Sequence, residues 1–563
     1  MKRFILILLF LGLFSSYLPH AQAQTKDSRK AKQTQPTDEN AFEIAKQLEI
    51  YVALFKELNT YYVNELNPAE LVKTSIDAML KTLDPYTVYY PESEMEDARF
   101  LTTGSYGGIG AMISKRGDYV QITEPYENAP AHLSGLMAGD IIKEVDGKSV
   151  KGLSTSDVTS LLKGQPETEV KVLVERKGKG DTLITIKRDK IKVPNIPYYG
   201  MLNDSIGYLL HSSFKENSYE DIREAISKMN EKGKLKGLVF DLRGNPGGLL
   251  IEAVRIAGLF TEKGQLIVST KGKVSSWDKE YRTYEHPLDT KMPLIFLVNE
   301  NSASASEILS GAMQDLDRAV IIGKRTLGKG LVQTPRPLPY NSQLKVTTAK
   351  YYIPSGRCIQ EIDYAHKGTD GKAIKVPDSL ISKFYTKNGR PVYDGKGIFP
   401  DIQTGKDTTP EIINFLLRDN VIFDFATNYR LKHNTIPSPD QFHISAADYD
   451  EFMAFVRDSK FSYQTAAEKS LEDFKKKAEN ENHFDLVKNQ YEELKARLNE
   501  EKNNDLIRYK KDITQLIENE IVSRYYFQKG RIIYNLAYDQ DIAEALKLFT
   551  DMNRYNKILG NSK

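Results

Sequence analysis

Three short segments between residues 241 and 333 contain the residue types that nucleophilic catalysis needs. A run of serines and alanines spans residues 302–306, Lys329 stands between two glycines, and a Gly- and Pro-rich segment follows Asp241. A serine hydroxyl is a poor nucleophile unless a base takes its proton, and a lysine can be that base only when it is neutral. Burial favours the neutral amine. Each segment alone is also typical of ordinary structure.

The segment from Asp241 to Leu250 predicts a buried strand that ends in a tight turn and is followed by a helix. Such a turn exposes backbone N–H groups at the carboxyl end of a strand, where ligands often bind. These groups suit a phosphate or an oxyanion. The segment lacks the lysine of a phosphate-binding P-loop, so a phosphate-dependent enzyme is the weaker interpretation.

The serine run joins an apolar strand to an amphipathic helix. A serine at the start of a helix lies where the helix dipole favours negative charge, but capping the helix is a common role for serine. Lys329 and Gln333 are four residues apart and share a face in either a helix or a strand. A lysine in a surface turn is the ordinary alternative for Lys329.

The elements around these segments predict an α/β core between residues 191 and 405. Apolar strands alternate with amphipathic helices, which implies a largely parallel sheet. The predicted strands cover 206–210, 237–242 and 293–299, and the predicted helices cover 219–229, 251–259 and 308–316.

A compact strand-rich module precedes the core. It opens on a Gly-rich stretch and contains one short helix over 157–162, with Ser156 as its expected N-cap. Its predicted strands cover 119–122, 141–145, 170–174 and 182–186.

Both ends of the chain have a different composition. Residues 1–23 combine a basic start, an apolar run and small residues at Ala21 and Ala23, which predicts a cleaved secretory signal peptide. The protein is therefore expected to be exported and periplasmic, and membrane-associated if this segment is retained. From about residue 410 the sequence predicts helices, with heptad-like seams over 484–498 and 506–516. We interpret each seam as a face within its own domain rather than as a dimeric coiled coil.

Composition excludes several classes of protein. The formal net charge is +2, so nothing in it draws the chain toward nucleic acid. The single cysteine, Cys358, cannot form an intrachain disulfide or a cysteine-rich metal site. Neither a metal nor a cofactor is implied.

Taken together, the motifs resemble the carboxyl-terminal processing peptidases, also called tail-specific proteases. These are serine endopeptidases with a Ser-Lys dyad and an embedded PDZ domain. The resemblance covers roughly residues 40–405, and it rests on segments in the right order and spacing. These segments are 241–250, 302–315, 326–333, 347–357 and 397–402.

The resemblance implies roles for individual residues. The middle serine of the run, Ser304, is the implied nucleophile, and Lys329, 25 residues later, is the implied base. Gln333 would orient Lys329 by a hydrogen bond. The oxyanion hole would combine the N–H of Ala305 with an N–H from the Gly247-Gly248 turn. Further matching positions are interpreted as structural support: Glu307, Asp315 and Thr326. The histidines His211 and His286 of the same domain leave a Ser-His arrangement formally open.

The strand-rich module resembles the PDZ domain of these peptidases. Gly108, Ile109 and Gly110 belong to the implied carboxylate-binding loop, whose N–H groups would hold the terminal carboxylate of a peptide. Ile109 and side chains of the 157–162 helix would line an apolar pocket for the last residue of that peptide.

The sequence therefore predicts a multidomain α/β (α+β) protein. Its core has a mixed, largely parallel sheet, an inserted β-rich PDZ domain precedes that core, and both terminal regions are helical. The predicted function is a secreted serine endopeptidase that recognises protein tails; a PDZ-bearing scaffold or chaperone-like protein with an inactive protease fold is the alternative. The C-terminal region leaves oligomerisation, adaptor binding and access control open. The predicted parts are a signal peptide (1–23), a linker (24–39), an N-terminal helical segment (40–103), the PDZ domain (104–190), the protease core (191–405) and the helical C-terminal region (406–563).

Overall fold

The computed structural model describes residues 38–232, 235–405, 409–459 and 461–561. The predicted signal peptide and all but the last two residues of the predicted linker lie outside these residues. The chain divides into two compact units, of which the first ends at Ser75 and the second begins at Ile76. Within the described ranges, no helix is both long enough and apolar enough to span a membrane.

The first unit contains helix α1 (Asp38–Tyr61) and the beginning of helix α2 (Pro68–Lys81). Both helices belong to the predicted N-terminal helical segment (40–103), except that α1 begins two residues before it. Many apolar side chains of α1 are exposed, among them Phe42, Leu48 and Leu54.

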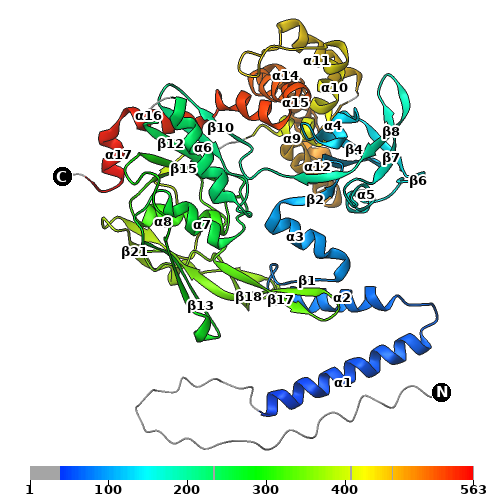
Figure 1. Cartoon of the computed structure of the whole chain (residues 1–563). Helices are drawn as coiled ribbons and strands as arrows, with labels where there is room; N and C mark the ends of the chain where they lie inside the picture. Colours follow the sequence, from blue (N-terminus) through cyan, green and yellow to red (C-terminus); the bar gives the residue numbers. More distant parts are fainter. Residues whose placement is uncertain (1–37, 233–234, 406–408, 460, 562–563) are drawn as a thin grey trace, which may run out of the picture. The chain divides into compact units, whose positions relative to one another are not determined.

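The second unit contains a six-stranded sheet, and its strands β10, β12 and β15 are labelled in Figure 1. Its strands pair in the order β10 (Tyr198–Met201), β11 (Ile206–Leu210), β12 (Gly237–Asp241), β15 (Leu294–Val298), β16 (Val320–Gly323) and β23 (Ile402–Gln403). All pairs are parallel except β10–β11. Strands β12 and β15 are buried along their whole length, as the continuous apolar runs require of strands covered on both faces. The predicted largely parallel sheet is confirmed.

Helices α6 (Ser218–Lys232), α7 (Leu250–Gly258) and α8 (Ala305–Asp315) cover one face of this sheet. Because side chains alternate along a strand, Leu238 and Phe240 pack with these helices, whereas Val239 faces the other side. On that other side lie α16 (Gln540–Thr550) and α17 (Met552–Ile558), shown in red in Figure 1. The end of the chain therefore completes the core, although its sequence predicts only a helical region.

A second sheet carries the lysine segment. Strand β18 (Ser342–Tyr352) pairs with β1 (Val88–Tyr90), β13 (Leu266–Gly272) and β17 (Leu331–Leu338), and β13 also pairs with β14 (Lys279–Arg282). Lys329 comes two residues before β17 and Gln333 lies within it. None of these strands was predicted.

The strand-rich module forms its own sheet in the order β3 (Ala111–Arg116), β4 (Tyr119–Pro125), β5 (Ile141–Val145), β7 (Glu169–Arg176) and β8 (Gly180–Lys187). Strand β2 (Ser105–Gly108) pairs separately with β9 (Asp189–Lys192). Helix α5 (Thr155–Leu162) is capped by Ser154, so the prediction of Ser156 as the cap is wrong. Ser154 and Asp157 form a capping box, which fixes the start of the helix.

Helices α9, α10, α11, α14 and α15 share a further apolar core. The second predicted seam is interrupted, because α14 (Asp505–Arg508) ends before α15 (Lys510–Leu536) begins. Its apolar residues Leu506, Tyr509, Ile513 and Leu516 all pack into or against this core. The other helices are α9 (Glu411–Arg418), α10 (Val421–Lys432), α11 (Ala446–Asp458), α12 (Ala466–Asn480) and α13 (Phe484–Asn503).

Candidate active site

Ser304 lies in the turn between β15 and α8, directly before the first residue of the helix. Its φ of 56° and ψ of −114° are unusual for a residue with a side chain, and such strain is typical of functional sites. The two flanking serines have structural partners. The Ser302 hydroxyl donates to the carbonyl of Leu242 at 2.8 Å, and the Ser306 hydroxyl donates to the carbonyl of Asn245 at 2.9 Å.

Ser302 and Ser306 are completely buried, whereas Ser304 is half-buried. Ser304 and Glu307 form a capping box at the start of α8, and among the described residues no acceptor is found for the proton of the Ser304 hydroxyl. Of the three serines in the run, Ser304 is therefore the one whose hydroxyl is left available for attack. The start of α8 adds a helix dipole that favours negative charge at this point.

The carboxylate of Glu307, which is completely buried, joins the serine and lysine segments. Its Oε2 accepts the backbone N–H of Ser304 at 2.8 Å and that of Lys329 at 2.9 Å. Its Oε1 accepts the N–H of Gly328 at 2.7 Å and the hydroxyl of Thr326 at 2.6 Å. Burial raises the pKa of Glu307 to about 7, although these donors oppose the shift.

The hydroxyl of Tyr351 makes a second link between the same segments. It lies 2.5 Å from the carbonyl oxygen of Lys329 and 3.2 Å from that of Ser304. Tyr351 is almost fully buried, so this contact is protected from water. The backbones of the two predicted catalytic residues are thus held by the same two buried side chains.

The Lys329 side chain is half-buried, and its Nζ lies 4.1 Å from the centre of the Tyr86 ring. Burial lowers the pKa of Lys329 to about 8, and the positive charge of Lys345 acts in the same direction. Glu307 and Asp84 oppose this shift. A substantial fraction of Lys329 is therefore neutral at mildly alkaline pH, as a general base must be.

Gln333 lies next to an irregularity in the pairing of β17 with β18. Its Nε2 donates to the hydroxyl of Thr347 at 3.2 Å. The predicted hydrogen bond to Lys329 is not among the contacts of the described residues. Gln333 therefore lies next to the lysine segment in sequence, but its side-chain amide binds Thr347 of β18.

The Gly-rich turn lies directly against Ser304. Gly247 has a φ of 98°, and a methyl group on it would lie 2.8 Å from both Ser304 Cβ and Ala305 N. The N–H of Gly247 donates to Asn245 Oδ1 at 2.9 Å. No acceptor within the described parts of the chain is found for the N–H groups of Gly248 and Ala305. Of the predicted oxyanion residues, Gly248 and Ala305 are thus the two with free donors.

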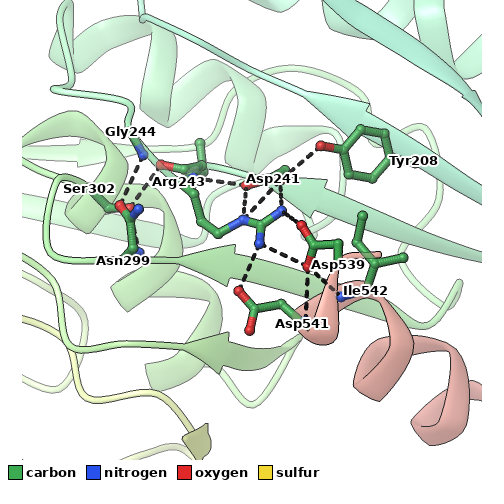
Figure 2. A network of polar contacts seen from close by, with 10 residues as sticks. Tyr208, Asp241, Arg243, Gly244, Asn299, Ser302, Asp539, Asp541 and Ile542 are labelled. Carbon is green, nitrogen blue, oxygen red and sulfur yellow. Dashed lines mark hydrogen bonds and ion pairs between the residues drawn. The ribbon is translucent and has the colours of Figure 1, made fainter. Parts of the chain in front are cut away.

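A cluster of charges fixes this turn to the end of the chain (Figure 2). Arg243 pairs with Asp241 at 2.6 Å, with Asp539 at 2.7 Å and with Asp541 at 2.8 Å. The hydroxyl of Tyr208 also donates to Asp241, at 2.8 Å. Because Asp539 caps α16, the helix that covers the back of the core sheet also holds the turn.

Neither of the two histidines that left a Ser-His arrangement open is found beside Ser304 in the described structure. His211 is completely buried, and burial lowers its pKa to about 3. Its ring packs edge-on against Phe214, and its Nδ1 lies 3.1 Å from the carbonyl oxygen of Asn195. His286 is exposed. Neither histidine has a described contact with Ser304.

The Gly-rich loop of the strand-rich module connects β2 to β3. Ile109 is 3% exposed and packs with Val158 and Leu162 of α5 in the core of the module. It therefore lies beneath the surface, rather than in the wall of an open pocket. Strand β3 is the last strand of its sheet, so one of its edges can accept a further strand.

These features define a serine peptidase with an α/β core and a peptide-binding module, and comparison with known proteins identifies the family. Residues 205–369 match peptidase family S41, residues 121–176 match a PDZ domain, and residues 412–549 match the C-terminal helical domain of probable PDZ-proteases. The chain belongs to the carboxy-terminal-processing serine proteases of family S41.

Relatives support this assignment over most of their length. The carboxy-terminal-processing protease of Bartonella bacilliformis is 38% identical over 330 residues, which is 58% of this chain and 75% of the relative. A probable CtpA-like serine protease of Staphylococcus aureus is 35% identical over 357 residues, which is 63% of this chain and 67% of the relative.

Two solved structures also match. The photosystem II D1 C-terminal processing protease is 26% identical, with 66% of this chain and 97% of that one covered and a TM-score of 0.35. The PDZ domain of a carboxy-terminal protease from Vibrio cholerae, in complex with peptide, is 38% identical, with 16% and 99% covered and a TM-score of 0.15.

Sequence reasoning missed Tyr86 and Tyr351. Tyr86 belongs to an Asp84-Pro85-Tyr86-Thr87 segment within the predicted N-terminal helical segment, for which the sequence indicates no catalytic role. Tyr351 lies in a segment that carries the family resemblance but offers no catalytic residue type of its own. Nothing in either local pattern indicates which distant loop the ring or the hydroxyl will contact.

Proposed function

We propose that the protein is an exported endopeptidase in which Ser304 is the nucleophile and Lys329 the general base. The shared carboxylate of Glu307 carries this proposal, because it binds the backbone of both residues within 3 Å. The available hydroxyl of Ser304 and the lowered pKa of Lys329 support it further.

Neutral Lys329 would take the proton of the Ser304 hydroxyl as Oγ attacks the carbonyl carbon of the scissile bond. The N–H groups of Ala305 and Gly248 would stabilise the oxyanion that forms. The ammonium of Lys329 would then give its proton to the leaving amine, which leaves an acyl-enzyme on Ser304. A water molecule, deprotonated by Lys329, would attack the ester, release the acid and restore the free serine.

The PDZ domain supplies the proposed selectivity. Backbone N–H groups around Gly108, Ile109 and Gly110 would bind the terminal carboxylate of a protein substrate, and the free edge of β3 would pair with its last residues. The predicted signal peptide supports export to the periplasm. Homo-oligomerisation or adaptor binding through the C-terminal helical region remains part of the proposal.

Activity-based labelling tests the dyad. The full mature chain is treated with a fluorophosphonate, and peptide mapping by mass spectrometry locates the label, which is expected on Ser304. Ser304→Ala should lose both label and cleavage of a loosely folded substrate, and Lys329→Ala should lose cleavage. Label on another residue, or equal cleavage by all three proteins, would contradict the dyad. Absence of cleavage by the intact chain on all substrates would favour the scaffold interpretation.

A test of the oligomeric state needs the complete chain. A chain that ends near residue 405 would lose α16 and α17 and expose one face of the core sheet, so its behaviour would not report on assembly. Light scattering of the full chain at several concentrations tests homo-oligomerisation directly. A monomer mass at every concentration would contradict it.

A further inference from the structure

The segment from Asp84 to Thr87 forms a locked turn beside the lysine. Asp84 Oδ1 accepts the N–H groups of Tyr86 and Thr87, each at 2.8 Å, and the Thr87 hydroxyl donates to Asp84 Oδ2 at 3.0 Å. The Thr87 hydroxyl also accepts the N–H of Thr347 in β18 at 3.2 Å. Asp84 and Thr87 are buried, so the turn is fixed to the sheet that carries the lysine segment.

This turn places the Tyr86 ring over the Lys329 amine, 4.1 Å from the ring centre to Nζ. The Tyr86 ring also packs edge-on with the ring of Tyr364, with ring centres 6.0 Å apart. A ring in this position has two opposite effects on the amine. Its π-electrons attract the ammonium form, and its bulk keeps water away, which favours the neutral form.

We propose that Tyr86 is a positioning residue for the reaction, which covers Lys329 and keeps water from its amine. The proposal rests on the proposed role of Lys329 as general base. Burial is the largest cause of the lowered Lys329 pKa, and the Tyr86 ring is one of the groups that cover the amine.

The pH dependence of kcat/KM in three variants tests this role. Tyr86→Phe keeps the ring and should keep the midpoint of the acidic limb. Tyr86→Ala admits water and should move that midpoint up by about 0.5 to 1 pH unit. Tyr86→Leu keeps an apolar cover without the π attraction, so its midpoint should stay in place or move down. Tyr89→Ala, from the adjoining strand, is the matched control and should not shift it.

An unchanged midpoint in Tyr86→Ala, or equal shifts in the Phe and Ala variants, would overturn the role of Tyr86. If Tyr86→Ala is too slow to assay, the midpoint comes from the rate of fluorophosphonate labelling against pH and from the Leu variant. Failure of the dyad itself is distinguishable, because Lys329→Ala would then retain cleavage.

A separate observation concerns the loop implied to bind substrate carboxylates. Helix α3 (Met95–Thr103) lies against β2, which leads into this loop, and Glu96 Oε1 accepts the N–H of Gly107 in β2, one residue before Gly108, at 3.3 Å. Phe100 of the same helix packs edge-on against Tyr106, with ring centres 5.5 Å apart. Asp97, the residue after Glu96, pairs at 2.5 Å with Lys163, which directly follows α5.

Helix α3 thus contacts β2 directly before the Gly-rich loop, and it contacts the residue that follows α5. The Gly-rich loop and α5 are the two elements expected to bound the tail site. Glu96 therefore places a carboxylate directly beside the loop whose N–H groups would bind the carboxylate of a peptide C-terminus. We infer that Glu96 is an internal competitor for the tail site, and that a substrate carboxylate must displace it. This inference rests on the proposed recognition of tails by the PDZ domain. Glu96 is exposed, so its displacement requires little desolvation.

Peptide binding to the full Ser304→Ala chain tests the competition. Fluorescein-labelled peptides with an apolar last residue are prepared with a free or an amidated C-terminus, and their affinities are measured by fluorescence anisotropy. Glu96→Gln should bind the free-carboxylate peptide several-fold more tightly than the parent does and leave weak binding of the amidated peptide unchanged. Glu127→Gln removes an exposed charge elsewhere on the PDZ domain and should change nothing.

Equal affinity of the parent and Glu96→Gln for the free peptide would overturn the competition. So would an equal gain in Glu127→Gln, because the effect would then be general electrostatic attraction. If neither protein distinguishes free from amidated peptides, tail recognition itself is wrong, and the inference fails with it.

Discussion

The backbone N–H of Lys329 donates to the buried carboxylate of Glu307 at 2.9 Å. The same oxygen accepts the N–H of Ser304, and the other oxygen accepts two further donors. An acceptor with four donors needs both of its oxygens. The distance between the serine and lysine segments therefore depends on an ionised or fully accepting side chain at position 307.

Glu307→Gln replaces one accepting oxygen by an NH₂ group that faces two donors. We expect kcat/KM to fall about 10- to 100-fold, because the two reacting residues lose their alignment. The unsatisfied donors should also lower stability by about 1–3 kcal/mol. Steady-state cleavage and thermal unfolding measure both effects. Glu300→Gln, an exposed neighbour, is the control, and activity equal to that of the parent in Glu307→Gln would contradict the positioning role.

The pKa of Lys329, lowered to about 8, predicts the pH dependence of cleavage. Below that pH the amine is mostly protonated and cannot act as a base, so kcat/KM should fall about tenfold per pH unit. Above it, the rate should level off. A pH profile with a fixed peptide substrate measures the midpoint. A rate that is independent of pH between 6 and 9 would contradict a lysine base.

Lys329→Met should remove activity but stabilise the fold. Because the pKa of Lys329 is lowered to about 8 on folding, the cost of burying its ammonium is fully present below pH 8. That cost is relieved as the pH rises from 8 toward the ordinary lysine pKa. The variant should therefore melt a few degrees higher than the parent at pH 7, and the gain should fade toward pH 10.5. A lower melting temperature at pH 7 would show that the amine stabilises the site.

Part of this site follows from the sequence. The strands β12 and β15 and the helices behind them are readable because continuous apolar runs alternate with amphipathic ones. The motif spacing also selects Ser304 and Lys329, and in the structure Glu307 binds the backbones of both residues. The capping of α5 was readable as well, since Asp157 stands three residues after Ser154 and not after Ser156.

The rest depends on contacts between distant segments. The apolar face of α16 shows that it packs against something, but not that its partner is Val239 and Ile295 on the back of the core sheet. In the same way, Asp84-Pro85 ends a helix in sequence, while the position of Tyr86 over Lys329 depends on the pairing of β1 with β18. Local patterns carry no information on such pairings.

Gly247→Ala should disable the nucleophile through sterics. The added methyl would lie 2.8 Å from Ser304 Cβ and from Ala305 N, and the backbone must also keep a φ of 98°. We expect kcat/KM to fall by about 100-fold or more, because both the attacking group and an oxyanion donor are displaced. Gly244→Ala is the matched control, since Gly244 has a φ of 72° but open space around it. Equal losses in the two variants would attribute the effect to backbone strain alone.

Arg243→Ala should loosen the end of the chain from the active-site turn. The Arg243 guanidinium balances Asp241, Asp539 and Asp541, and Asp241 is 2% exposed (Figure 2). Arg243, Asp539 and Asp541 are partly exposed, so the loss should lie between the about 1 kcal/mol of an exposed pair and the about 3–5 kcal/mol of a fully buried one. Urea unfolding should show this loss.

Arg282→Ala is the control for Arg243→Ala. Arg282 pairs with Glu280 on the surface, and such an exposed pair contributes about 0–1 kcal/mol. Hydrogen exchange of the peptide that contains α16 gives an independent measure, since α16 should exchange faster in Arg243→Ala and not in Arg282→Ala. Unchanged protection of α16 would mean that the apolar face of the helix holds it in place without the charges. The turn around Gly247 would then be fixed by the core sheet alone.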